Sequence, residues 1–169
     1  SIYWEFGSGL ILPKTGIIMQ NRGISFSLEQ NHFNKLIPGR KPFHTIQPAL
    51  AQFDDGRVMS YGTMGGEGQP QTQATIFLRY AVQNLDLQEA INQPRWLLGR
   101  TWGEETTSLK IEGRFSKEIF QKLKSMGHLT EKVGDFEEIM GHAGAIVNNP
   151  NGLIEGAHDL RSDGAAIGG

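Results

Sequence analysis

The sequence contains no cysteine, which excludes disulfide bonds and metal sites built on thiolates. It also lacks any apolar run approaching the roughly 20 residues that a membrane-spanning helix needs. Neither sign of charge dominates, because 16 basic residues stand against 18 acidic ones and both kinds are spread along the chain. Without a basic stripe or an acidic tail, nothing indicates nucleic-acid binding or a strongly charged partner. The five histidines show no zinc-like spacing and no phosphate-binding loop occurs, so we expect neither a metal nor a cofactor.

What is present is the composition of an ordinary globular protein. The 169 residues, 38% of them hydrophobic and 20% charged, suffice for one domain with its own core. The chain begins with "SIYWEFGSGLIL", which has neither an initial Met nor the basic region of a signal peptide. We therefore expect a single domain over residues 1–169 that lacks its natural front, and localisation is not readable from it.

Short apolar runs bounded by turn residues predict most of the secondary structure. Two hairpins are expected, around the turns at residues 54–56 and 150–152. A third pair of runs flanks residues 13–15, and residues 27–46 form an irregular excursion. The expected strands are 9–12, 16–20, 48–53, 57–63, 108–113, 145–149 and 153–157, and the expected helices are 73–83, 87–93 and 116–126. This pattern indicates an α+β fold with mostly antiparallel strands and helices on the outside.

The helices carry apolar side chains at helical spacing. In the first, Ile76 and Tyr80 share a face that Leu78 and Val82 would widen. The helix at 116–126 is bounded by clear signals, since Ser116 can cap its first turn and Gly127 stands where a left-handed C-cap belongs.

The stretch "GTMGGEGQPQTQ" (62–73) places two adjacent glycines between a predicted strand and a predicted helix. Amides at such a turn point outward near the positive end of the helix dipole, which suits an oxygen that becomes negative during acyl transfer. An ordinary glycine turn without a ligand is the alternative, and spacing alone favours it. Gly65 and Gly66 are therefore a candidate oxyanion site.

Three further residues could bind a substrate, each with a structural alternative. Arg22 follows an apolar run and could clamp a carboxylate with two parallel bonds, or it could be a surface cation at a strand end. His44 and Thr45 stand between two prolines that restrict the backbone, and could point at a ligand or belong to a solvated loop.

For the remaining polar candidates a structural role is the better interpretation. His142 is expected to be packed or capping, and Asp159 and Arg161 are expected to form an ion pair near the C-terminus. No Ser-His-Asp order and no nucleophile elbow occurs. The chain thus has receiving groups for acyl transfer but no attacking group.

Five blocks of the sequence resemble the gamma-glutamyltranspeptidase family, in the family's order and above all in its gamma-glutamyltransferase-like and cephalosporin-acylase-like branch. They are "FGSGLILPKTGIIMQNRG", "PGRKPFHTIQPAL", "GTMGGEGQPQTQ", "INQPRWLLG" and "GAHDLRSDGAAIG". The resemblance implies the four-layer αββα sandwich of N-terminal nucleophile hydrolases, of which this chain would be the small-subunit portion. It also implies a precursor that cuts itself and exposes a threonine. The threonine hydroxyl attacks a gamma-glutamyl amide while its own amino group acts as base.

The resemblance implies roles for individual residues. Gly65 and Gly66 match the family's oxyanion-hole pair, and Ser1 matches a second threonine that supports the nucleophile. The substrate-binding positions are Tyr3, Arg22, Ser25, His44 and Thr45.

Several of these positions depart from the true transpeptidases. Ser25 stands where they carry an acid that holds the substrate's amino group, Tyr3 replaces an asparagine, and His44 and Thr45 replace two adjacent serines. These departures argue against strict glutathione specificity, whereas Arg22 indicates that a substrate carboxylate is still held.

The resemblance places the nucleophile upstream of Ser1 and the large subunit outside this chain. We therefore expect the 169-residue chain alone to have no turnover, with the large subunit of the same precursor as its partner. Three interpretations of the parent protein remain. It is a gamma-glutamyl hydrolase or transferase, an amidase acting on glutaryl or similar amides, or a homologue without catalysis.

Overall fold

The computed structural model describes residues 2–3, 6–47, 49–101 and 105–168. The chain divides into two compact units, Ser1–Ile46 and Gln47–Gly169, and each is described by itself. The expectation of a single domain over residues 1–169 stays a prediction. Among the helices of the described residues, none is long and apolar enough to cross a membrane.

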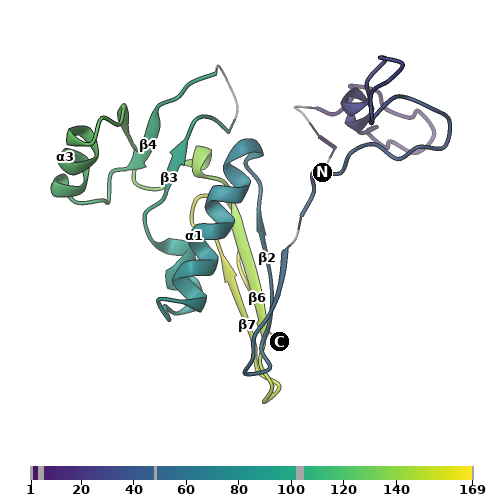
Figure 1. Ribbon diagram of the computed structural model, residues 1–169. Helices are drawn as coiled ribbons and strands as arrows, with labels where there is room; N and C mark the ends of the chain where they lie inside the picture. Colours follow the sequence, from purple (N-terminus) through teal and green to yellow (C-terminus); the bar gives the residue numbers. More distant parts are fainter. Residues whose placement is uncertain (1, 4–5, 48, 102–104, 169) are drawn as a thin grey trace. The chain divides into compact units, whose positions relative to one another are not determined.

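The second unit is built on a four-stranded antiparallel sheet with the strand order β1-β2-β6-β7 (Figure 1). β1 (Ala49–Gln52) and β2 (Val58–Thr63) form one hairpin, and β6 (Ala143–Asn148) and β7 (Ile154–His158) form the other. β2 pairs with β6 in the middle of the sheet, so strands that lie far apart in the sequence become neighbours. Both predicted hairpins are confirmed.

Two helices, α1 (Gln69–Ala81) and α2 (Leu87–Asn92), cover one face of this sheet (Figure 1). Because successive strand residues point to opposite faces, the small and branched residues of every second position meet the helices. α2 begins at a firm cap, since the Asp86 carboxylate accepts hydrogen bonds from the Gln88 and Glu89 amides. The resulting core contains Met59, Ile76, Tyr80, Leu87, Ala90, Ile91, Ala143, Ala145, Val147 and Ala157.

The predicted apolar face of α1 was too wide. Leu78 is 51% exposed and Val82 is 65% exposed, whereas Ile76 and Tyr80 are buried. Since each helical residue is rotated by about 100° from the one before, residues 78 and 82 lie across the helix from residues 76 and 80. The helix also begins earlier than expected, at Gln69, because a proline fits well in a first helical turn.

A second, three-stranded sheet contains β3 (Trp96–Leu98), β4 (Leu109–Glu112) and β5 (Thr130–Val133) in that order. β4 was predicted, and it pairs antiparallel with β3 and parallel with β5. β3 and β5 were not predicted because each is only three or four residues long and lacks a clear apolar alternation.

Helix α3 (Lys117–Ser125) connects β4 to β5 (Figure 1). Its left-handed C-cap is confirmed, since Gly127 has a φ of 91°. The expected N-terminal cap is wrong, because the Ser116 hydroxyl makes no capping bond to a backbone amide. The helix has no buried residue, and Ile119 is 41% exposed.

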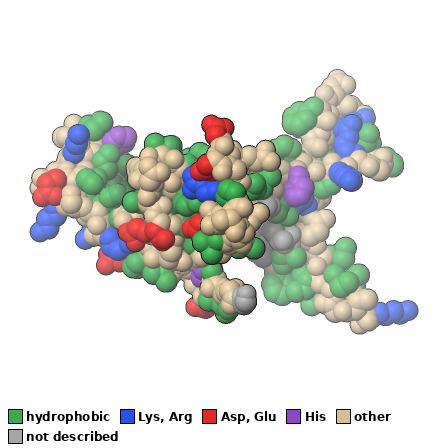
Figure 2. Space-filling view, turned by 90° about the horizontal axis from the view of Figure 1, so that it is seen from below, with side chains coloured by type: hydrophobic (Ala, Val, Ile, Leu, Met, Phe, Trp, Pro, Cys, Tyr) green, Lys and Arg blue, Asp and Glu red, His purple; other side chains and the backbone are tan. Residues whose placement is uncertain are grey.

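The first unit contains little regular structure. The runs at 9–12 and 16–20 pair only through the antiparallel bridge between Ile11 and Ile18, so the expected strands shrink to a single bridge. Residues 27–46 are irregular, as predicted. One short 3-10 turn, η1 (Arg22–Ser25), precedes them. Broad green apolar areas lie between charged side chains on the face seen in Figure 2. The exposed apolar residues of this unit include Phe6, Leu10, Ile17, Leu28 and Phe33.

Candidate functional site

The glycine turn connects the central strand β2 to the helix α1. β2 ends at Thr63, Gly65 follows, and the 3-10 turn η2 (Gly66–Gly68) leads directly into α1. Gly65 has a φ of 132° and Gly66 a φ of 50°. Both values lie in the region that strains residues with a side chain, so the backbone path itself requires glycine at these two positions.

Close packing is a second reason for the missing side chains. A Cβ atom on Gly66 would lie 2.8 Å from the Thr101 carbonyl oxygen, and one on Gly68 would lie 2.9 Å from Leu97 Cδ1. Thr101 is itself fixed, since its hydroxyl donates to the Ile139 carbonyl at 2.5 Å. The glycine content of this turn is therefore explained by conformation and packing, without a ligand.

The amides of the turn remain available. Within the part of the chain that the structure describes, neither the Gly65 amide nor the Gly66 amide donates a hydrogen bond. The neighbouring Met64 amide does donate, to the His142 carbonyl at 3.3 Å. Free amides also occur in the first turn of other helices, so the turn fits both interpretations of the glycines. The oxyanion role of Gly65 and Gly66 stays a prediction.

An open groove of about 510 Å³ borders the turn at Glu67. Its wall combines charges of both signs, and Arg100 and Glu105 approach each other at 3.5 Å. Two hydroxyl groups, those of Thr106 and Thr107, complete the lining. This mixture of charges does not select a ligand of one sign.

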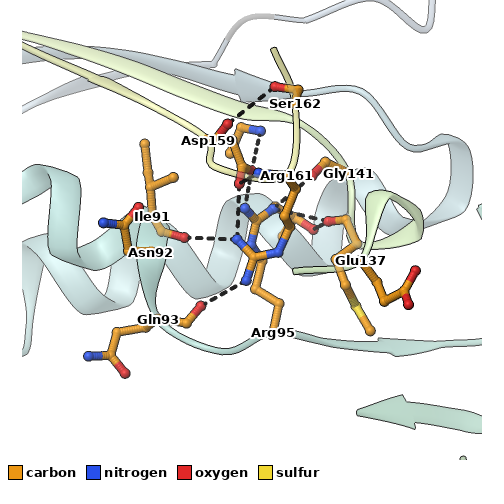
Figure 3. A network of polar contacts seen from close by, with 12 residues as sticks. Ile91, Asn92, Gln93, Arg95, Glu137, Gly141, Asp159, Arg161 and Ser162 are labelled. Atoms are coloured by element: carbon orange, nitrogen blue, oxygen red, sulfur yellow. Dashed lines mark hydrogen bonds and ion pairs between the residues drawn. The ribbon is translucent and has the colours of Figure 1, made fainter. Parts of the chain in front are cut away.

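A buried network of charges is centred on Arg95, Asp159 and Arg161 (Figure 3). Arg95 is 1% exposed and pairs through Nη2 with Asp159, which is fully buried. Asp159 also pairs with Arg161 Nη1 at 3.0 Å, so the predicted ion pair between Asp159 and Arg161 is confirmed. The second carboxylate, that of the fully buried Glu112, accepts from Arg161 at 2.5 Å and from Arg114 at 2.9 Å.

The network fixes the charge states of its members. Burial lowers the pKa of Arg95, against the opposing charge of Asp159. Burial acts to raise the pKa of Asp159, but the charge of Arg95 and the hydrogen bond from the Ala143 amide outweigh it, so this pKa lies below its ordinary value. Burial also opposes the charge on Arg161, yet the hydrogen bonds and charge of Glu112 raise the pKa of Arg161. Both shifts favour the charged forms of Asp159 and Arg161, so this ion pair persists at neutral pH.

A second cluster of predicted site residues lies in the first unit. Arg22 is only 8% exposed, and its Nη1 donates to the Thr45 hydroxyl at 2.6 Å. The guanidinium lies over the ring of Tyr3, 4.5 Å from the ring centroid. Tyr3 has a φ of 62°, a strained value for a residue with a side chain. The structure thus brings Arg22, Thr45 and Tyr3 together, although their roles stay predictions.

Arg22 has no counter-charge among those residues of the cluster that the structure describes. None of the ion pairs among the described residues involves it. A buried cation is normally paired, because desolvation of an isolated charge is expensive. The guanidinium is therefore suited to an anionic group that another molecule brings.

The other predicted residues are placed as follows. Ser25 lies in η1 with Arg22, and its hydroxyl donates to the Arg22 carbonyl at 2.9 Å. His44 is exposed and turns to its own neighbour, accepting from the Ile46 amide at 3.0 Å. His142 is half-buried, with Nε2 3.8 Å from Glu138, which fits its expected packed role. Ser1 lies outside the described residues.

Sequence reasoning missed the largest part of the buried network. Arg95 and Glu112 were not singled out, although both stand within or beside apolar runs. A charged residue that directly precedes the run "WLL", or ends the run "LKIE", is the signal that could have indicated buried pairing.

Comparison with known proteins identifies the chain's relatives. The family model of gamma-glutamyltranspeptidases matches residues 1–169. The chain is 61% identical to the oxamate amidohydrolase proenzyme of Klebsiella pneumoniae subsp. pneumoniae and 49% identical to the glutathione hydrolase-like YwrD proenzyme of Bacillus subtilis, over 99% of this chain. It spans about a third of their length, 32% in each case.

A solved structure shows the same fold. The cephalosporin acylase from Bacillus halodurans is 34% identical, with a TM-score of 0.74 over 100% of this chain and 31% of that one. The predicted fold class, that of N-terminal nucleophile hydrolases, is confirmed. The matching blocks, the fold and the family model agree, and the chain belongs to the gamma-glutamyltranspeptidase family.

Proposed function

We propose that the parent protein is an N-terminal nucleophile amidohydrolase whose substrate is an amide bearing a carboxylate and no ammonium group. The observation that carries the substrate class is the buried Arg22, which has no counter-charge among the described residues, together with Ser25 in place of an acid. A guanidinium can bind a carboxylate with two parallel hydrogen bonds. A serine offers no charge to an ammonium group.

In this proposal the chemistry follows the acyl-transfer scheme of such hydrolases. A threonine hydroxyl upstream of Ser1 attacks the amide carbon, and the threonine's own amino group takes the proton. The carbonyl oxygen becomes negative and is received by the Gly65 and Gly66 amides. The amine leaves with the proton, and water then cleaves the acyl-threonine ester. The free amides of the turn support this assignment.

The rest of the precursor is the proposed partner of this chain. The helices cover one face of the central sheet, while Leu50, Ile146 and Ile154 on the opposite face are 55% to 68% exposed. The remaining positions of that face include Gly62, Gly144 and Gly156, which leave it flat enough for a second sheet. We propose that the large subunit supplies that sheet.

Gamma-glutamyl hydrolysis or transfer is the second candidate. The resemblance to the glutathione hydrolase-like relative favours it, and Arg22 could equally hold the α-carboxylate of a glutamyl group. The two candidates differ in whether an ammonium group beside that carboxylate is accepted.

Four primary amides separate the candidates, because all of them release ammonia and can be compared in one assay. Oxamate, succinamate and glutaramate carry a carboxylate at increasing distance, and L-glutamine is glutaramate with an added ammonium group. The full-length protein is used after gel electrophoresis has shown two chains. We expect kcat/KM for glutaramate or a shorter amide to exceed that for glutamine at least about tenfold, because an unpaired buried charge costs more than 1–3 kcal/mol. Higher kcat/KM for glutamine would support the gamma-glutamyl candidate instead. A full-length sequence without the upstream threonine would favour the non-catalytic interpretation.

A further inference from the structure

The segment 139–143 is held by the buried ion pair on one side. Arg95 Nη1 donates to the carbonyl oxygens of Met140 at 3.0 Å and of Gly141 at 3.2 Å. Arg95 Nη2 pairs with Asp159 Oδ2, and the same carboxylate oxygen accepts from the Ala143 amide at 2.7 Å. The two partners of one ion pair thus bind carbonyls and an amide of the same short segment, as Figure 3 shows for Arg95, Asp159 and Gly141.

The other side of this segment lies directly against the glycine turn. The His142 carbonyl accepts from the Met64 amide, and a Cβ atom on Gly65 would lie 3.5 Å from Gly141 Cα. A Cβ atom on Gly141, in turn, would overlap the carbonyl oxygen of Met64. Because no side chain separates the two backbones, a displacement of segment 139–143 displaces the turn.

We infer that the Arg95–Asp159 ion pair sets the position of the glycine turn, which makes Arg95 a positioning residue for the Gly65 and Gly66 amides. The catalytic consequence rests on the proposed function, whereas the mechanical link does not. Arginine is required because its planar fork reaches two carbonyls with one nitrogen and a carboxylate with the other. A lysine has the same charge, but its single nitrogen cannot hold both groups in place.

Arg161 provides a matched control within the same network. It is 6% exposed and pairs with Asp159, as Arg95 does. The Nη1 atom that pairs with Asp159 also donates to the Ile91 carbonyl, while Nε and Nη2 bind Glu112 and Nη2 donates to the Gln93 carbonyl. None of the hydrogen bonds of Arg161 in the described chain reaches segment 139–143. Arg95→Lys and Arg161→Lys therefore disturb the same charge cluster, but only the first loosens the segment behind the turn.

The test compares these two variants in the full-length protein by hydrogen–deuterium exchange and by steady-state kinetics. The reporter is the Met64 amide, whose hydrogen bond to His142 joins the turn to the segment. Arg95→Lys is expected to speed the exchange of this amide at least about tenfold relative to Arg161→Lys. The reason is that segment 139–143 can then move away from the turn without breaking the hydrogen bonds that Arg95 makes in the wild type. With the proposed function, kcat for the best amide also falls about 10- to 100-fold, as expected for small misplacement of a catalytic group, while KM changes little.

Equal exchange at Met64 in the two variants would overturn the inference. Faster exchange with unchanged kcat would support the mechanical link and count against the proposed role of the Gly65 and Gly66 amides.

If the Arg95→Lys protein does not fold, two milder substitutions can be compared instead. Thr72→Val removes the hydroxyl that donates to the Met140 carbonyl at 3.1 Å. Thr75→Val removes a bond within α1, to the Gln71 carbonyl at 2.7 Å. Faster exchange at Met64 in Thr72→Val alone supports the inference, and equal exchange in both contradicts it.

Discussion

Replacing Gly66 by alanine tests whether the exact course of the glycine turn matters for activity. Two effects are expected. An alanine at a φ of 50° is strained by about 1–2 kcal/mol. Its Cβ atom would also lie 2.8 Å from the Thr101 carbonyl oxygen, closer than van der Waals contact allows, so the turn or residue 101 must shift.

Gly127→Ala is the control for backbone strain alone. Gly127 has a φ of 91°, and a Cβ atom there would have no neighbour within 4 Å. Its substitution should therefore reduce the free energy of unfolding by about 1–2 kcal/mol and leave the turn in place. The difference between the two variants isolates the displacement of the turn.

The assay is ammonia release by the full-length protein, with unfolding in urea measured on the same samples. If a Gly66 amide that has moved no longer meets the oxyanion, kcat should fall about 100- to 1,000-fold. Gly127→Ala should keep kcat within about threefold of the wild-type value, as expected for a change far from the reacting atoms. A Gly66→Ala protein that is cleaved normally and keeps its kcat would show that the Gly66 amide does not receive the oxyanion.

Three further predictions follow from the buried charges and the first unit. Glu112→Gln should reduce the free energy of unfolding by about 3–5 kcal/mol, because it leaves the single carboxylate of Asp159 to compensate the buried charges of both Arg95 and Arg161; urea unfolding measures this, and a loss below about 1 kcal/mol would contradict it. The pKa of Asp159 is lowered from 3.8, so the carboxylate stabilises the fold fully above that pH and less as the pH falls further. Urea unfolding should be measured between about pH 5 and pH 2.5, the range in which carboxylates titrate. Over this range the free energy of unfolding should fall less in Asp159→Asn than in the wild type. Arg22→Met should raise KM for carboxylate-bearing amides at least about tenfold, and Arg22→Lys less, because a lysine keeps the charge without the paired bonds; equal KM values in all three proteins would exclude Arg22 from substrate binding.

The parts of the fold that were predictable are those with local signals. The hairpin turns at 54–56 and 150–152 contain Gly56 and Gly152, each with a φ of 89°, and glycine in such a turn is visible in the sequence. The strand–turn–helix path through Gly65 and Gly66 was visible for the same reason. β3 and β5 escaped prediction because their pairing with β4 depends on tertiary contacts.

The candidate site was only partly predictable, because its contacts join distant parts of the chain. Arg22 and Thr45 were identified as separate candidates, and the bond between them spans 23 positions. The pairing of Arg95 with Asp159 spans 64 positions, and no spacing rule could have found it. The family resemblance indicated the glycine pair. That Gly65 packs against Gly141, and Gly66 against Thr101, became visible only in the structure.

In the proposed function, the Gly65 and Gly66 amides receive the acyl oxygen. The most direct test is a crystal structure of the full-length, cleaved protein carrying an acyl or tetrahedral adduct on the N-terminal threonine that we propose as the nucleophile. We expect the adduct's oxygen to lie within about 2.7–3.1 Å of both amide nitrogens. An oxygen bound by other groups, with these two amides turned away from the adduct, would contradict the proposed role.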